Sequence, residues 1–99
     1  MKIHTKIYLD FFGYGEQDFI PSEVSGQRSN DVHHLIFKGM GSSKDKEFIE
    51  NLVSLTREEH NKAHDDPDYN KQVQIIHLRF IQIHRPDYEI RFDYRHLID

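Results

Sequence analysis

The chain has 99 residues, of which 36% are hydrophobic and 30% charged, and its formal net charge is −4. This length favours one domain with a modest core, and the composition is that of a soluble globular protein rather than a disordered one. Because the chain has no cysteine, disulfides and thiolate metal sites are excluded, so any metal ion would be held by histidine and carboxylate side chains.

The first half of the chain is predicted to contain two strands. In residues 2–11 apolar residues stand at odd positions with polar residues between them, which indicates a half-buried strand. Residues 13–30 are rich in glycine and serine and form connecting structure. The sequence "DVHHLIF", residues 31–37, is the second predicted strand, and a loop with glycine, serine and lysine follows it through Lys46.

The second half is predicted to be mainly helical. After a short buried strand at 51–55, Thr56 and Glu59 have the spacing of a helix capping box. A second helix begins at Pro67, which suits a first helical turn, and ends before Pro86. Its apolar residues recur at spacings of four and three and predict one apolar stripe, Tyr69, Val73, Ile76, Phe80 and Ile83. Alternation in residues 88–94 predicts a closing strand.

Four histidines have a spacing that predicts a metal site. His60 and His64 stand four residues apart on a predicted helix, so they share one face and can hold one ion. Asn61 follows His60 where a zinc peptidase motif needs glutamate, which disfavours that class. His33 and His34 are neighbours in a strand and point to opposite faces, so one can join the helix ligands while the other is left to accept a proton.

The remaining histidines are interpreted as ordinary surface or hydrogen-bonded core residues. They are His4, His77, His84 and His96. None of them stands at a spacing typical of metal ligands.

The order "DVHHLIF", Asn51 in "ENLVSL", then "TREEHNKAH" resembles the HNH endonuclease family over roughly residues 20–66. The resemblance implies an α+β fold: one small domain spanning 1–99, with a ββα-metal core at about 30–66, an added C-terminal helix and flanking terminal strands. It also implies hydrolysis of DNA phosphodiester bonds. A small cysteine-free chain of this kind resembles products of phages or mobile elements, in which case the compartment would be the host cytoplasm.

The resemblance implies a role for each matching residue. His34 corresponds to the general base that takes a proton from the attacking water, and Asn51 to the residue that braces the loop and orients that base. His33, His60 and His64 correspond to the metal ligands of the three-histidine subgroup.

Further correspondences involve the surroundings of this site. Asp31 resembles an acidic residue that positions a phosphate-contacting arginine, although the sequence does not say which arginine. Many members of the family also hold a structural zinc on two Cys-x-x-Cys pairs, and here other residues stand in those places: Ser22, Ser25, Thr56 and Glu59. We therefore expect no structural zinc, with hydrogen bonds of the capping box partly replacing it.

The expected cofactor is one divalent metal ion, and the expected partner is DNA. Three imidazoles suit Zn²⁺, Ni²⁺ or Mn²⁺ better than Mg²⁺, which prefers oxygen ligands, yet Mg²⁺ is abundant in cells, so the identity of the metal stays open. Phosphate contacts are predicted from cations near the histidines, namely Lys38, Lys44, Lys46 and Arg57. The acidic net charge argues mildly against DNA binding, unless the acids lie on another face.

Two other functions remain open at this point. One is a non-catalytic, metal-stabilised nucleic-acid-binding module, and the other is a protein-interaction domain built on the helix at 68–85. The apolar stripe and the predicted closing strand also suggest a homodimer. No apolar run is long enough to span a membrane or to form a signal peptide, which predicts a cytoplasmic protein without a membrane partner.

Overall fold

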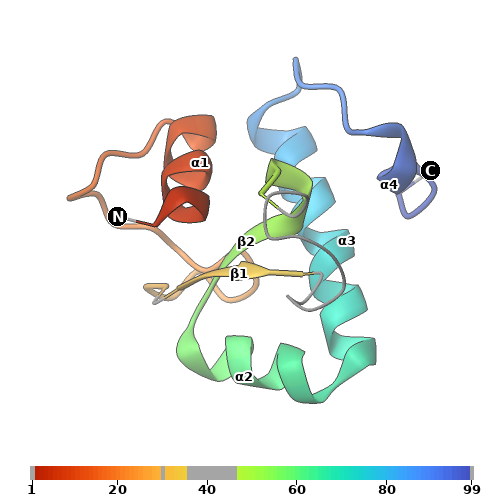
Figure 1. The fold of residues 1–99 in the computed structure, drawn as a ribbon, viewed down its shortest axis with the longest axis horizontal. Coiled ribbons are helices and arrows are strands. Elements are labelled where there is room, and N and C mark those ends of the chain that lie inside the picture. Colours follow the sequence, from red (N-terminus) through yellow and green to blue (C-terminus); the bar gives the residue numbers. More distant parts are fainter. Residues whose placement is uncertain (1, 30, 36–46, 99) are drawn as a thin grey trace.

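The computed structural model describes residues 2–29, 31–35 and 47–98 and has an α+β fold (Figure 1). Within these residues the sheet has two antiparallel strands. The elements in chain order are α1 Ile3–Phe12, β1 Asp31–His34, the 3₁₀ turn η2 Ile49–Asn51, β2 Leu52–Leu55, α2 Arg57–Asp65, α3 Pro67–His84 and α4 Phe92–Arg95.

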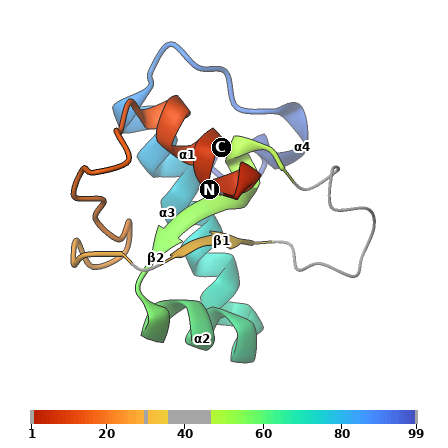
Figure 2. The same cartoon turned by 60° about the vertical axis from the view of Figure 1, so that its left-hand side comes forward.

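The strand pair lies between α1 on one side and α2 on the other, while the long α3 runs past both (Figures 1 and 2). In the register of β1 and β2, His33 is paired with Val53 and His34 with Leu52. Directly paired residues share a face of the sheet. Leu52 belongs to the hydrophobic cluster with α1 residues, whereas Val53 packs with Val73 of α3. The two adjacent histidines therefore face opposite sides, as predicted.

The predicted starts of α2 and α3 are confirmed. Thr56 Oγ1 accepts a hydrogen bond from the Glu59 N–H at 3.2 Å, and Glu59 Oε1 accepts from the Thr56 N–H at 2.9 Å, which completes the capping box. At α3 the Asp66 carboxylate accepts from two backbone N–H groups, with Pro67 in the first turn. The strand predicted at 51–55 is confirmed in β2, although Asn51 itself belongs to η2.

The strand predicted at 2–11 is wrong, because these residues form α1. Ile3, Ile7 and Phe11 are four residues apart, and that spacing fits one face of a helix as well as alternation in a strand. The helix buries Tyr8 and Leu9. It ends at Gly13, whose positive φ of 76° allows its N–H to bond the Leu9 carbonyl.

The closing strand predicted at 88–94 is also wrong. Residues 88–91 have no regular structure, and α4 follows them. Glu50 Oε2 accepts hydrogen bonds from the Arg91 N–H at 2.9 Å and from the Tyr88 hydroxyl at 2.8 Å. The Arg91 N–H is therefore bonded to a side chain and not to a neighbouring strand. Of the strand predicted at 31–37, residues 31–34 form β1, and 36–37 lie outside the described residues.

The predicted stripe on α3 is only partly buried. Val73 lies in the core and Tyr69 packs against it, but Ile76 is 37% and Ile83 74% exposed. The face of α3 that the fold buries consists of Val73, His77, Leu78 and Ile81. Apolar residues occur on more than one face of this helix, so its periodicity alone did not identify the packed side. No helix among the described residues is long and apolar enough to cross a membrane.

Candidate metal and catalytic pocket

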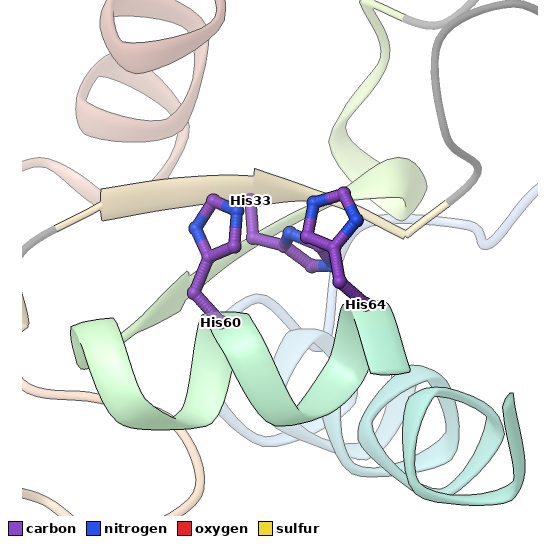
Figure 3. A group of neighbouring side chains, drawn as sticks. All are labelled: His33, His60 and His64. Carbon is purple, nitrogen blue, oxygen red and sulfur yellow. The ribbon is translucent and has the colours of Figure 1, made fainter. Parts of the chain in front are cut away.

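The three histidines predicted as metal ligands lie together. His33 projects from β1 toward α2, where His60 and His64 stand one turn apart (Figure 3). One ring nitrogen from each residue lies within 4.8 Å of the others. The ring centroid of His33 is 4.5 Å from that of His60 and 5.4 Å from that of His64. We refer to this set as the histidine trio.

Polar neighbours contact two rings of the trio, those of His33 and His60. Asn70 donates its side-chain N–H to the Leu35 carbonyl at 2.8 Å, and its Oδ1 lies 3.4 Å from His33 Nε2. His60 Nδ1 lies 3.3 Å from Asp31 Oδ2. Both of these last two atoms are buried, and neither has a well-aligned hydrogen bond among the described residues. A carboxylate behind an imidazole is the usual support of a metal-ligating histidine.

Burial favours the neutral, metal-binding form of two of these histidines, His33 and His60. The pKa of His33 is lowered from 6.5 to about 4, first by burial and then by the neighbouring imidazole of His60. Burial also lowers the pKa of His60, although Asp31 opposes that shift. Neutral imidazoles have a lone pair for a cation, and three of them on two rigid elements fit Zn²⁺, Ni²⁺ or Mn²⁺.

His34 faces the opposite side, toward α1, and its neighbours there were missed by sequence reasoning. Its Nε2 contacts Oε1 of Glu47, and the other carboxylate oxygen lies 3.8 Å from His4 Nδ1. The rings of His4 and His34 are 4.6 Å apart between centroids. Neither His4 nor Glu47 stands at a diagnostic spacing, so no sequence signal could have connected them to His34.

Asn51 lies where it can brace the end of β1. It is 1% exposed in η2, and its carbonyl accepts a hydrogen bond from the Leu35 N–H at 2.9 Å. Its own N–H donates to the Phe48 carbonyl at 2.9 Å. These bonds join the residue after His34 to the segment that carries Glu47.

A cavity of about 690 Å³ extends along β1 and is lined by the histidines on both faces of this strand. It is lined by His33, His60 and His64, by His4 and His34, and by cationic side chains that include Lys2, Arg28 and Arg57. Arg57 donates to Asp31 Oδ1 at 3.2 Å, so among the described residues it is the arginine that Asp31 positions. Lys2 and Arg28 were not predicted, while Lys38, Lys44 and Lys46 lie outside the described residues.

The residues at the expected cysteine places form a hydrogen-bonded cluster. Ser22 Oγ donates to Glu59 Oε1 and accepts from the Val24 and Ser25 N–H groups at 3.1 and 3.3 Å. Burial opposes ionisation of Glu59, yet the hydrogen bonds from Ser22 and Thr56 hold its pKa below the usual value. The cluster ties the 22–26 turn to the start of α2.

Comparison with known proteins identifies no relative. No family model matches the chain, and neither a curated protein nor a solved structure is significantly similar to it. A functional proposal therefore depends on the geometry of the pocket and on the motif residues.

Proposed function

We propose that the protein is a metal-dependent HNH-type endonuclease that hydrolyses DNA phosphodiester bonds, with β1, β2 and α2 as its ββα-metal core. One observation carries the proposal: the histidine trio and His34 line the same cavity from opposite faces of β1. A site that only stabilised the fold would need the trio alone, whereas His34 adds to the same cavity a side chain that can accept a proton.

The trio would hold one divalent cation. A bound cation supplies Lewis-acid stabilisation of the negative charge that develops on the phosphate and on the leaving oxygen. Asp31 keeps His60 in place from behind, and Asn70 does the same for His33. Both contacts reduce the freedom of the rings before any ion arrives.

His34 is the proposed general base. In a neutral imidazole one nitrogen carries the proton and the other a lone pair. Because Nε2 contacts the Glu47 carboxylate, an N–H at Nε2 donates to Glu47, and Nδ1 is then the atom that accepts a proton from water. Asn51 supports this arrangement through its backbone bonds to Leu35 and Phe48.

Cations around the cavity would bind the phosphates of DNA. Arg57 is held by Asp31, and Lys2 and Arg28 lie on the same lining. This clustering offsets the acidic net charge of −4, because affinity for phosphate depends on where the cations lie.

A plasmid-nicking assay tests the proposal. The wild-type chain is incubated with supercoiled DNA and Mg²⁺, Mn²⁺, Zn²⁺ or Ni²⁺, with and without chelator. We expect nicking that chelator abolishes and that His33→Ala loses. His96→Ala is the matched control, because His96 is an exposed histidine outside the cavity. Absence of chelator-sensitive nicking with all four metals, while DNA binding persists, would favour the non-catalytic binding module instead.

A further inference from the structure

A second group of potential ligands lies on the face of β1 opposite the trio. His4 comes from α1, His34 from β1 and Glu47 from the segment just before η2. One donor atom from each lies within 4.8 Å of the others. Their side chains are 11–15% exposed, so most of their surface is buried by the protein but an ion from solvent can still reach them.

The donor set has the chemistry of a transition-metal site. Two imidazoles and one carboxylate are ligands typical of zinc, and they leave a coordination position for water. The carboxylate of Glu47 already approaches both rings, with one oxygen in contact with His34 Nε2 and the other 3.8 Å from His4 Nδ1. Tetrahedral ligands about 2.0–2.2 Å from an ion lie roughly 3.3–3.6 Å apart. Modest side-chain rotation would therefore bring these atoms into position.

We propose that His4, His34 and Glu47 form a second divalent-cation site, and that an ion bound there inhibits the enzyme by taking a nitrogen of its base. The binding site stands on geometry alone, whereas the inhibitory role rests on the proposed nuclease function. We call these residues the second site.

The inhibition follows from the single lone pair of a neutral imidazole. Without an ion in the second site, the proton of His34 is on Nε2 beside Glu47, and Nδ1 can accept a proton. When Nε2 ligates a cation, the ring proton is on Nδ1, having moved there through solvent with no net release. His34 then has no lone pair for the attacking water.

The second site should bind more weakly than the trio. A cation there must displace the contact between His34 and Glu47, whereas the trio offers imidazoles without an acidic side chain among them. Transition metals should thus activate at low concentration and inhibit at higher concentration. Mg²⁺ should not inhibit, because it prefers oxygen ligands and a nearly complete octahedral shell.

Calorimetric titration of the full chain with Zn²⁺ alone tests the binding. We expect two events in the wild type. His4→Ala and Glu47→Gln should each lose the weaker event and keep the tighter one, while His96→Ala should keep both. Thermal unfolding monitors whether each variant is folded, and Glu47→Gln preserves side-chain size in case His4→Ala loosens α1. A single event in the wild type, or a weaker event that survives in both folded variants, would overturn the second site.

Nicking assays test the regulation separately. In wild type, Zn²⁺ that fills the second site should lower the rate by about 10²–10⁴-fold, the usual effect of losing a general base. His4→Ala, compared with its own rate at low Zn²⁺, should show no fall in rate at the higher Zn²⁺ concentrations; retained inhibition would disprove the regulatory role. Two binding events in the titration, with no nicking even at metal concentrations that fill only the tighter site, would refute the nuclease proposal and support the second site. A single binding event together with chelator-sensitive nicking would refute the second site and support the nuclease proposal.

Discussion

Two histidines among the described residues are almost completely buried, and their environments shift their pKa values in opposite directions. His33, in the trio, is 2% exposed, and burial beside other imidazoles lowers its pKa to about 4. His77, on α3, is fully buried, and although burial alone would lower its pKa, the Glu23 carboxylate raises it. Burial lowers the pKa of both rings, so the opposite directions come from the neighbours: imidazoles beside His33 and a carboxylate beside His77.

The hydrogen bonds of His77 support a protonated ring. Nδ1 lies 2.8 and 3.0 Å from the two oxygens of Glu23, and Nε2 lies 2.6 Å from the Ile49 carbonyl. Since both nitrogens face acceptors, both must donate. Glu23 also accepts a hydrogen bond from the Tyr8 hydroxyl at 2.6 Å. The Tyr8 hydroxyl oxygen lies 3.0 Å from Ser54 Oγ. This buried network joins α1, α3 and β2, so His77 serves the fold whereas the trio faces the cavity.

The largest expected effects separate His33 from His34 within the cavity. His34→Ala should lower the nicking rate by about 10²–10⁴-fold and leave the tight metal-binding event nearly intact, because it removes a base and not a ligand of the trio. His33→Ala should lose both activity and tight binding, since two histidines hold a cation poorly. Nicking rates beside calorimetric titration measure both. Loss of the tight event in both variants would mean that His34 is itself a ligand of that ion.

Breaking the buried pair should affect stability and not metal binding. Glu23→Gln leaves the charge of His77 without its partner, and removal of one member of a buried pair destabilises by about 3–5 kcal/mol. A double replacement, Glu23→Leu with His77→Leu, should be less damaging than the single one because it leaves no unpaired charge. Urea denaturation measures the free energies of unfolding. A single variant as stable as wild type would show that the pair is not charged.

His77 and His33 should make the stability of the fold depend on pH with opposite signs. The raised pKa of His77 contributes stability that is complete below pH 6.5 and is lost as pH rises through its folded pKa. The lowered pKa of His33 contributes stability that is complete above pH 6.5 and is lost as pH falls toward about 4. Denaturation series of the metal-free chain measure both limbs. His33→Ala should flatten only the acidic limb; a flattened alkaline limb in that variant would contradict the assignment.

A smaller effect is expected at the cationic rim of the cavity. Arg57→Ala should weaken DNA binding and lower the magnitude of the slope of log K against log salt by about one unit, as loss of one phosphate contact requires. Arg95→Ala is a matched control, because Arg95 lies on α4 beside Glu89 and outside the cavity. Binding isotherms at several salt concentrations provide the slopes. Equal slopes for wild type and Arg57→Ala would remove Arg57 from the contacts.

The smallest effect on stability is expected at Ile83, which is 74% exposed and belongs to neither region. Ile83→Lys should change the free energy of unfolding by less than about 0.5 kcal/mol, as for most surface substitutions. The predicted homodimer, if it uses the exposed side of α3, should dissociate in this variant. Sedimentation at micromolar concentration compares the two chains, and a monomeric wild type would dismiss the dimer.

The sequence by itself determined the features that depend on a few adjacent residues. The four-residue spacing of His60 and His64 places both on one face of α2. Successive side chains of a strand point to opposite faces, which places His33 and His34 on opposite sides of β1. The Thr56 capping box was readable for the same reason, because its hydrogen bonds close within one turn.

Only the tertiary structure decided the features that depend on distant segments. Residues 3–12 satisfy both a helical and a strand period, and burial of Tyr8 against the rest of the fold selects the helix. The contact of His34 with Glu47 spans 13 residues and that of His77 with Glu23 spans 54. No local rule connects such pairs, because a pKa and a hydrogen-bond partner depend on which groups the packing brings within a few ångströms.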